Sequence, residues 1–199
     1  MVAVRASIGL VEANTKVLFS IQVRSCALEL GQNGTDALGR LYDLTAQRLV
    51  RYAATLTHNQ HDAEDAMQAA IVRISTNPKG LMEAWHPWAY LLKIVHNEAL
   101  KIVRRKRPFP LSPTLPDTGD ESSNQQSDAE SRNSIQTALR KLPTAQSQVV
   151  VLKIWEEMTF LEIGEVLGLS PNTIASRYRY ALQKLTQHLQ PLAKEVLHG

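Results

Sequence analysis

Cysteine is nearly absent from this chain, since only Cys26 occurs among its 199 residues. A single cysteine excludes an internal disulfide framework, and no cluster of cysteine and histidine has the spacing of zinc ligands. The sequence therefore predicts neither a metal nor any other cofactor. A chain of this kind fits a reducing, cytoplasmic setting.

Long apolar runs are also missing. The N-terminal stretch is interrupted by Arg5, Glu12, Lys16 and Arg24. It has neither the continuous apolar core of a signal peptide nor the length that crosses a bilayer. We expect neither secretion nor membrane insertion.

No set of side chains has the pattern of an active site. The best group is His58, His61 and Asp62, which lie in or beside the polar stretch HNQH. Histidines in a polar turn between helices are usually just solvated, so the group is a weak candidate for metal binding or catalysis. The sequence predicts a protein that is not an enzyme.

Positive charge is present in clusters rather than in large excess. The formal net charge is only +3, yet the sequence pI is near 9.1 and a basic run occupies residues 104–107. Such clustering suits an anionic partner, with nucleic acid as the first candidate. A length of 199 residues suggests one or two domains, and we favour two.

A linker divides the chain at residues 108–131, where prolines, serines and acids replace any apolar period. We predict an all-α protein of two small helical domains, residues 35–107 and 132–199, joined by this flexible linker. Residues 1–34 form an N-terminal extension of unknown role, which could serve a regulator, be a disordered tail, or reflect a wrongly assigned start.

Three helices are expected before the linker, at residues 36–57, 62–75 and 87–106. Apolar residues recur at three-and-four spacing in each, and the first helix places Leu41, Tyr42 and Leu49 on its inner side. Asp62 is a suitable cap for the second helix. Glu64, Asp65 and Gln68 face away from that helix's apolar side, so they are either solvated or part of a protein interface.

The third helix carries a polar and basic stripe on its outer face. Its members recur every three or four residues over roughly 18 Å, which suits a phosphate backbone: Lys93, Asn97, Lys101, Arg104 and Arg105. Trp85 and Tyr90 lie near its start and are candidates for stacking on single-stranded bases. Aromatic rings are more often core residues, and we assign Trp88 to the core.

Residues 159–189 read as a helix-turn-helix. The first helix ends at Gly168, and Ser170 followed by Pro171 starts a second one. Its inward side is expected to hold six residues: Ile174, Tyr178, Ala181, Leu182, Leu185 and Leu189. Its outward side holds Asn172, Ser176, Arg179 and Gln183, which suits the major groove, while Arg177 grips the DNA backbone or braces the fold. A hairpin with a merely solvated polar face is the alternative.

Two segments together resemble a known family. LYDLTAQRLVRYAATLTHNQHDAEDAMQAAIVRI with WAYLLKIVHNEALKIVRRKR is similar to region 2 of the small bacterial sigma factors of the extracytoplasmic-function (ECF) group. ALRKLPTAQSQVVVLKIWEEMTFLEIGEVLGLSPNTIASRYRYALQKL is similar to their region 4. The resemblance implies a factor that binds core RNA polymerase, recognises the −10 and −35 promoter elements and promotes DNA melting.

The family's roles carry over residue by residue. The beta-prime clamp helices of the polymerase would meet Asp62, Glu64, Asp65 and Gln68, and the beta subunit would be a further partner. The −10 element would meet Trp85, Tyr90, Lys93, Asn97, Lys101, Arg104 and Arg105. The −35 element would meet Pro171, Asn172, Thr173, Ser176, Arg177, Arg179 and Tyr180. The resemblance also allows a separate anti-sigma factor as a partner.

One departure and one rival stay open. Ala175 stands where many relatives have a basic residue, which would shift phosphate contacts to Arg177, Arg179 or Tyr180. The rival is a free-standing helix-turn-helix regulator with an unrelated helical sensor in front. It predicts dimers on palindromic operators, whereas a sigma factor predicts asymmetric, bipartite sites.

Overall fold

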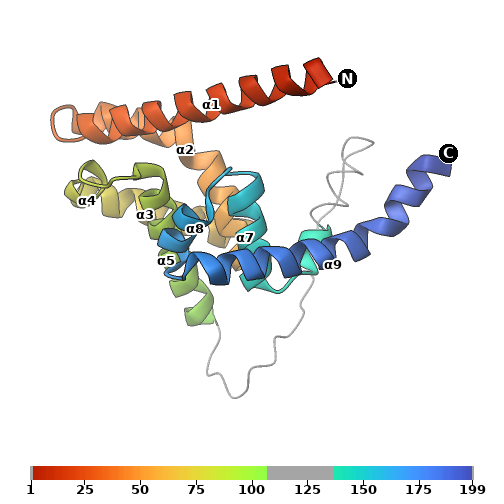
Figure 1. Cartoon of the computed structure of the whole chain (residues 1–199). Coiled ribbons are helices and arrows are strands. Elements are labelled where there is room, and N and C mark those ends of the chain that lie inside the picture. The colour runs from red at the N-terminus through yellow and green to blue at the C-terminus, as the bar shows by residue number, and fades with distance from the viewer. Residues whose placement is uncertain (1, 107–136, 199) are drawn as a thin grey trace.

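The computed structural model describes the backbone of residues 2–106 and 137–198, and the side chains of residues 15–106 and 137–189. Helices are the only regular elements in these ranges, which confirms the all-α prediction (Figure 1). They are α1 (Val2–Glu29), α2 (Gly34–Thr57), α3 (Gln60–Thr76), α4 (Lys79–Met82), α5 (Pro87–Lys106), α7 (Thr144–Ile154), α8 (Phe160–Leu167) and α9 (Pro171–His198). The predicted linker, residues 108–131, lies outside the described residues.

The first domain is built on α2, α3 and α5, each of which packs against the other two. Leu41, Leu49 and Leu92 are among the residues that fill the space between them. Trp88 is buried as predicted. Tyr42 is 43% exposed, so its predicted inward position was wrong.

The start of α3 differs from the prediction. The helix begins at Gln60 rather than Asp62, and its cap is Asn59, whose side chain accepts a hydrogen bond from the Asp62 backbone N at 3.1 Å. His58, in the left-handed conformation at φ 53°, ends α2 just before it. Asparagine caps as well as aspartate does, so composition alone chose the wrong one of two suitable residues.

Helix α1 belongs to the first domain through its C-terminal half. It packs along α2 (Figure 1) and also contacts α4 and α5. Its residues Val23, Cys26 and Ala27 are buried. The predicted extension therefore supplies core residues, and residues 15–30 are not a disordered tail. Apolar residues occur around most of this helix, so no single stripe revealed its packing side.

The second domain consists of α7, α8 and α9 with residues 137–142. Ala181 and Leu185 of α9 close a small core with Ala138, Leu139 and Val150. The rest of its apolar surface joins the core of the first domain, because α7 packs on α2 and α8 on α5. The two domains are thus in direct contact.

Candidate nucleic-acid interface

A capping box fixes the start of α8. The Thr159 hydroxyl accepts a hydrogen bond from the Glu162 backbone N at 3.2 Å, and the Thr159 backbone N donates to Glu162 Oε2 at 2.7 Å. Burial alone would raise the pKa of Glu162, but these bonds and electrostatic attraction by Lys16 and His86 outweigh it. The Glu162 pKa is therefore lowered, and the carboxylate stays ionised at the positive end of α8.

The turn between α8 and α9 is tight. Gly168 ends α8 with φ 67°, as the sequence predicted, and the Leu169 backbone N donates to the Gly164 carbonyl at 3.1 Å. A Cβ atom on Gly164 would lie 2.6 Å from the Leu169 carbonyl oxygen. This position therefore requires glycine for the two helices to meet.

The start of α9 agrees with the predicted serine cap. The Ser170 Oγ accepts a hydrogen bond from the Thr173 backbone N at 3.2 Å, and the two hydroxyls lie 2.8 Å apart. Thr173 is thus held in the cap and is half-buried. Ile174 is buried and Tyr178 packs against Phe160, so one side of α9 is fixed on α8.

The opposite side of α9 is open. Of the residues predicted for the −35 element, five are exposed: Pro171, Asn172, Ser176, Arg179 and Tyr180. Arg177 is half-buried. The Arg179 guanidinium lies 5.2 Å from the centre of the Tyr180 ring, which keeps these two neighbours together. Leu182 is 38% exposed, so its predicted inward position was wrong.

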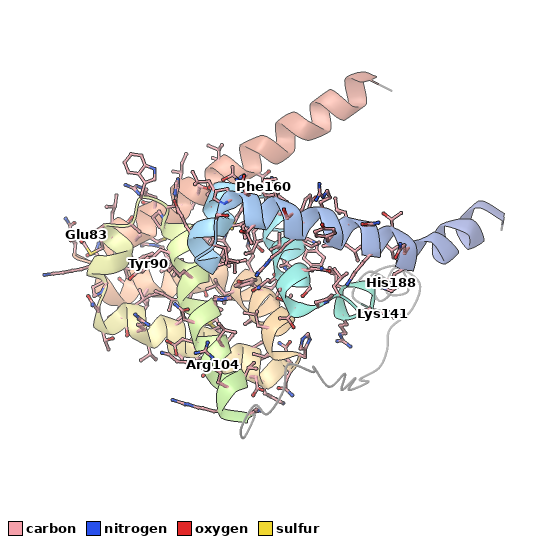
Figure 2. All side chains as sticks on the ribbon, turned by 60° about the horizontal axis from the view of Figure 1, so that its bottom comes forward. Glu83, Tyr90, Arg104, Lys141, Phe160 and His188 are labelled. Carbon is pink, nitrogen blue, oxygen red and sulfur yellow. The ribbon has the colours of Figure 1, made fainter. Side chains whose placement is uncertain are left out.

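The predicted basic stripe is present on α5. Lys93, Asn97, Lys101, Arg104 and Arg105 are all exposed, although α8 packs on the same helix. Figure 2 shows Tyr90 and Arg104 near opposite ends of α5, so the stripe extends along most of the helix.

One acid, Glu98, pairs with two cations at the basic stripe: Lys101 of α5 and Arg73 of α3. Lys101 Nζ lies 2.8 Å from Glu98 Oε1, which also meets Arg73 at 3.5 Å. The Lys101 and Arg73 side chains are about half exposed, whereas the Glu98 side chain is only 13% exposed. The Lys101 ammonium is open to solvent, so a phosphate could approach it beside Glu98.

The loop before α5 places the two candidate aromatic residues differently. Trp85 is 85% exposed, with its ring edge towards His86 at 6.4 Å between centres. Tyr90 is half-buried, and its hydroxyl packs so closely on Gly80 that a Cβ atom there would be 2.2 Å away. Trp85 is therefore open to a base, whereas Tyr90 supports the loop.

The four residues predicted to contact polymerase from α3 differ in their exposure. Asp65 and Gln68 are exposed. Glu64 accepts a hydrogen bond from Gln60 at 2.7 Å on the helix surface. Asp62 is buried, and its Oδ1 lies 2.6 Å from Lys106 Nζ at the end of α5. Asp62 therefore ties α3 to α5, which the sequence did not show.

A buried carboxylate joins the two domains. Glu156, in the loop after α7, is fully buried, and its two oxygens accept hydrogen bonds from Arg48 Nε at 2.8 Å and Arg51 Nη2 at 2.7 Å. The Arg48 guanidinium also lies 3.8 Å from the centre of the Phe19 ring of α1. No local pattern marks these residues, because the contact spans more than 100 positions of sequence.

The weak histidine site of the sequence analysis is not assembled. Within the described part of the chain, no three histidine, cysteine, aspartate or glutamate side chains gather as metal ligands would. Among the same residues, no helix has both the length and the apolar character needed to cross a bilayer.

The sequence matches two family domains in the expected order. Residues 41–109 match sigma-70 region 2, and residues 132–185 match sigma-70, region 4. The region 2 match covers most of the first domain. It speaks against the rival regulator, which would carry an unrelated sensor in that position.

Several named sigma factors align with this chain over most of their own length. The chain is 33% identical to the RNA polymerase sigma-E factor of Streptomyces avermitilis over 144 residues, which are 71% of this chain and 79% of that protein. It is 30% identical to the RNA polymerase sigma factor CarQ of Myxococcus xanthus, over 81% and 94% of the two chains. It is 27% identical to the ECF RNA polymerase sigma factor SigW of Bacillus subtilis, over 79% of this chain and 91% of that protein.

Two solved structures share the fold. CnrH, determined in complex with the cytosolic domain of CnrY, aligns with a TM-score of 0.61 at 21% identity, over 85% of this chain and 98% of that one. RpoE of Bartonella quintana, determined with the anti-sigma factor NepR, aligns with a TM-score of 0.57 at 20% identity, over 75% of this chain and 94% of that one. With the family matches, this shows that the chain belongs to the sigma-70 family of RNA polymerase sigma factors, as a promoter-recognition factor of the ECF group with regions 2 and 4.

Proposed function

We propose that this sigma factor binds core polymerase through α3, reads the −35 element with α9, and captures an unstacked base of the −10 element beside α5. The observation that carries the proposal is Trp85, a large apolar ring exposed to 85% directly before a basic helix face. Tryptophan is highly buried on average, so an indole this exposed is unusual, and bases stack on such rings. The proposed role needs no catalytic group, because binding of extruded bases favours melting.

The two DNA-binding surfaces differ in chemistry. The exposed face of α9 offers an amide and a guanidinium at the N-terminal end of a helix, which suits duplex DNA in the major groove. The α5 face combines Trp85 with spaced cations, which suits a single strand. Together they support an asymmetric, bipartite site.

The polymerase contact is proposed for the exposed part of α3, with Asp65 and Gln68 at its centre. The test is co-elution of the chain with sigma-free core polymerase from its own host during size exclusion. Asp65→Arg should abolish co-elution, whereas Asp43→Arg, an equal charge change at an exposed site on α2, should not. Failure of the folded wild-type chain to co-elute would refute the proposal. We place this activity in the cytoplasm, with the polymerase.

An anti-sigma factor is a further proposed partner, supported by the two solved structures of this fold that hold such partners or a second protein. A cleft of about 520 Å³ lies between α2 and the second domain, lined by Val50 and Trp155 together with the cations Arg51 and Arg140. An acidic, amphipathic segment fits this lining. A true anti-sigma factor should co-purify with the tagged chain, exclude core polymerase, and lose affinity for Arg140→Glu. A partner that co-purifies together with polymerase would contradict this proposal.

A further inference from the structure

The loop that carries Trp85 is ordered internally only as far as Ala84. Between α3 and α5 it contains the single turn α4, in which the backbone N atoms of Leu81, Met82, Glu83 and Ala84 donate to carbonyls of the same loop at 2.9–3.3 Å. After Ala84 the chain must turn Trp85 outward before α5 begins. Something outside the loop has to fix those peptide planes if the indole is to hold one orientation.

Arg24 of α1 makes that contact. Its Nη1 atom donates to the Ala84 carbonyl at 2.9 Å and to the Trp85 carbonyl at 3.1 Å. These two carbonyls belong to consecutive residues, so one guanidinium nitrogen fixes the peptide planes on both sides of the Trp85 backbone. Charge-assisted hydrogen bonds of this kind are stronger than bonds between neutral groups.

Arg24 is itself held in place by the packing of α1. Val23, the residue directly before it, is fully buried, and Cys26 and Ala27 follow on the same packed helix. The turn after α1 also touches the loop directly, because a Cβ atom on Gly31 would lie 2.8 Å from the end of the Met82 side chain. From the other side, the Tyr90 hydroxyl packs on Gly80. The loop is thus supported between α1 and α5.

Lysine would not replace this arginine. The guanidinium is planar and offers its donors in a fixed arrangement, whereas an ammonium is a compact charge on a flexible stem. A lysine at position 24 keeps the positive charge but orders two neighbouring carbonyls less well. The charge-conserving variant therefore separates orientation from simple attraction of DNA.

We propose that Arg24 is a positioning residue for the −10 element: it orients the loop so that the Trp85 ring is ready to stack on an unstacked base. This inference rests on the proposed function, in which Trp85 receives that base. It gives the C-terminal half of α1, which lies before the region 2 match, a defined part in promoter opening.

The test measures promoter opening by holoenzyme, with 2-aminopurine placed in turn at each position of the −10 element. Trp85→Ala should reduce open complexes by roughly 5- to 150-fold, the range expected for loss of one stacked base. Arg24→Gln should reduce them by about fivefold or more, at the same base position, and Arg24→Lys should restore them only in part. Arg40→Gln, which removes the ion pair between α2 and Glu29 of α1 while leaving the loop untouched, should have little effect.

The double variant decides how Arg24 acts. If Arg24 works through Trp85, then Arg24→Gln should add almost nothing to Trp85→Ala, since residues acting as one unit are not additive. Additive losses that are equal at every base position and full rescue by Arg24→Lys would instead mean a phosphate contact, and would overturn the inference. Unchanged opening in Arg24→Gln would overturn it as well.

Failure of the underlying function has a different result. If Trp85→Ala opens promoters as the wild type does, then base capture by Trp85 is wrong, whatever Arg24 does. If Trp85→Ala fails while Arg24→Gln does not, only the role of Arg24 is wrong. Two controls apply to each variant: thermal unfolding shows that the chain is folded, and co-elution shows that it binds core polymerase.

Discussion

Arg48 of α2 and Glu156 of the second domain lie 2.6 Å apart at their closest side-chain atoms, with the glutamate fully buried. Arg51 binds the other oxygen of the same carboxylate. A buried carboxylate with two arginine partners is costly to leave half-paired. This contact and the apolar surface around it therefore hold the DNA-reading helix unit against the first domain.

Loss of this carboxylate is expected to open the molecule. Glu156→Ala leaves Arg48 and Arg51 without their shared partner, and because these arginines are 28% and 44% exposed the loss should cost about 1–3 kcal/mol of stability. Small-angle scattering should show a larger radius of gyration for the free variant than for the wild type, and urea unfolding should show the lower stability. Asp43→Ala, an exposed acid on α2, is the control and should change neither quantity. An equally compact, equally stable Glu156→Ala would mean that the apolar contact alone joins the domains.

Two glycine-to-alanine substitutions, one at the helix-turn-helix and one in α2, are expected to have opposite effects. Gly164→Ala places a methyl group 2.6 Å from the Leu169 carbonyl, so α8 and α9 must move apart and −35 binding should fall. Gly39→Ala, inside α2 with open space around it, should instead stabilise the chain by about 0.5–1 kcal/mol. Thermal unfolding of both variants and −35 affinity of their holoenzymes provide the comparison. A stabilising Gly164→Ala would show that the turn has room to spare.

Much of this turn could be read from the sequence because its signals are local. The glycine stop and the serine cap act on residues within one turn, and both are present as predicted. Leu182 misled the pattern because it lies at the edge of the apolar side of α9: Ala181 and Leu185 are covered by neighbouring residues, whereas Leu182 is 38% exposed. Spacing gives the side of a helix on which a residue lies, but not whether another element covers that side.

The support of the Trp85 loop could not be read in the same way. Arg24 and the carbonyls it binds are about 60 positions apart, and backbone acceptors leave no mark in a sequence. The pairing of Asp62 with Lys106 could not be read from the sequence either. The sequence had assigned Asp62 to a helix cap and to the polymerase surface. Exposure of Trp85 itself was predicted only as one of two choices, because rings of this size are usually buried.

A buried pair makes the stability of the first domain depend on pH. The Tyr52 hydroxyl lies 3.0 Å from His96 Nδ1 inside the core, and burial lowers the pKa of His96 below its usual value near 6.5. The unfolded chain therefore binds this proton more readily than the folded one. The contribution of His96 is fully present above pH 6.5 and should be lost as the pH falls from 6.5 towards the lower pKa of the folded state.

Urea unfolding between pH 7.5 and 5 measures this effect. His96→Gln, which cannot take up the proton, should lose less stability on acidification than the wild type does. The difference should not exceed about 1.4 kcal/mol for each pH unit, the limit for one group. His61→Gln removes an exposed histidine and should leave the wild-type pH dependence in place. Identical slopes for His96→Gln and the wild type would contradict the prediction.

The last prediction separates base reading from phosphate binding on α9. Asn172 is exposed at the start of α9 and Lys184 is exposed three turns later. In the proposed docking, the Asn172 amide would reach base edges, whereas Lys184 would lie beside the DNA backbone. Asn172→Ala should cost about 1–3 kcal/mol on the preferred −35 sequence and relax the choice of base at one position. Lys184→Ala should weaken all sequences alike and lower the salt dependence by about one counterion. Holoenzyme affinities for a set of −35 variants at several salt concentrations measure both. Uniform weakening by Asn172→Ala would transfer the reading role to other residues of the same face, with Ser176 and Arg179 next to be tested.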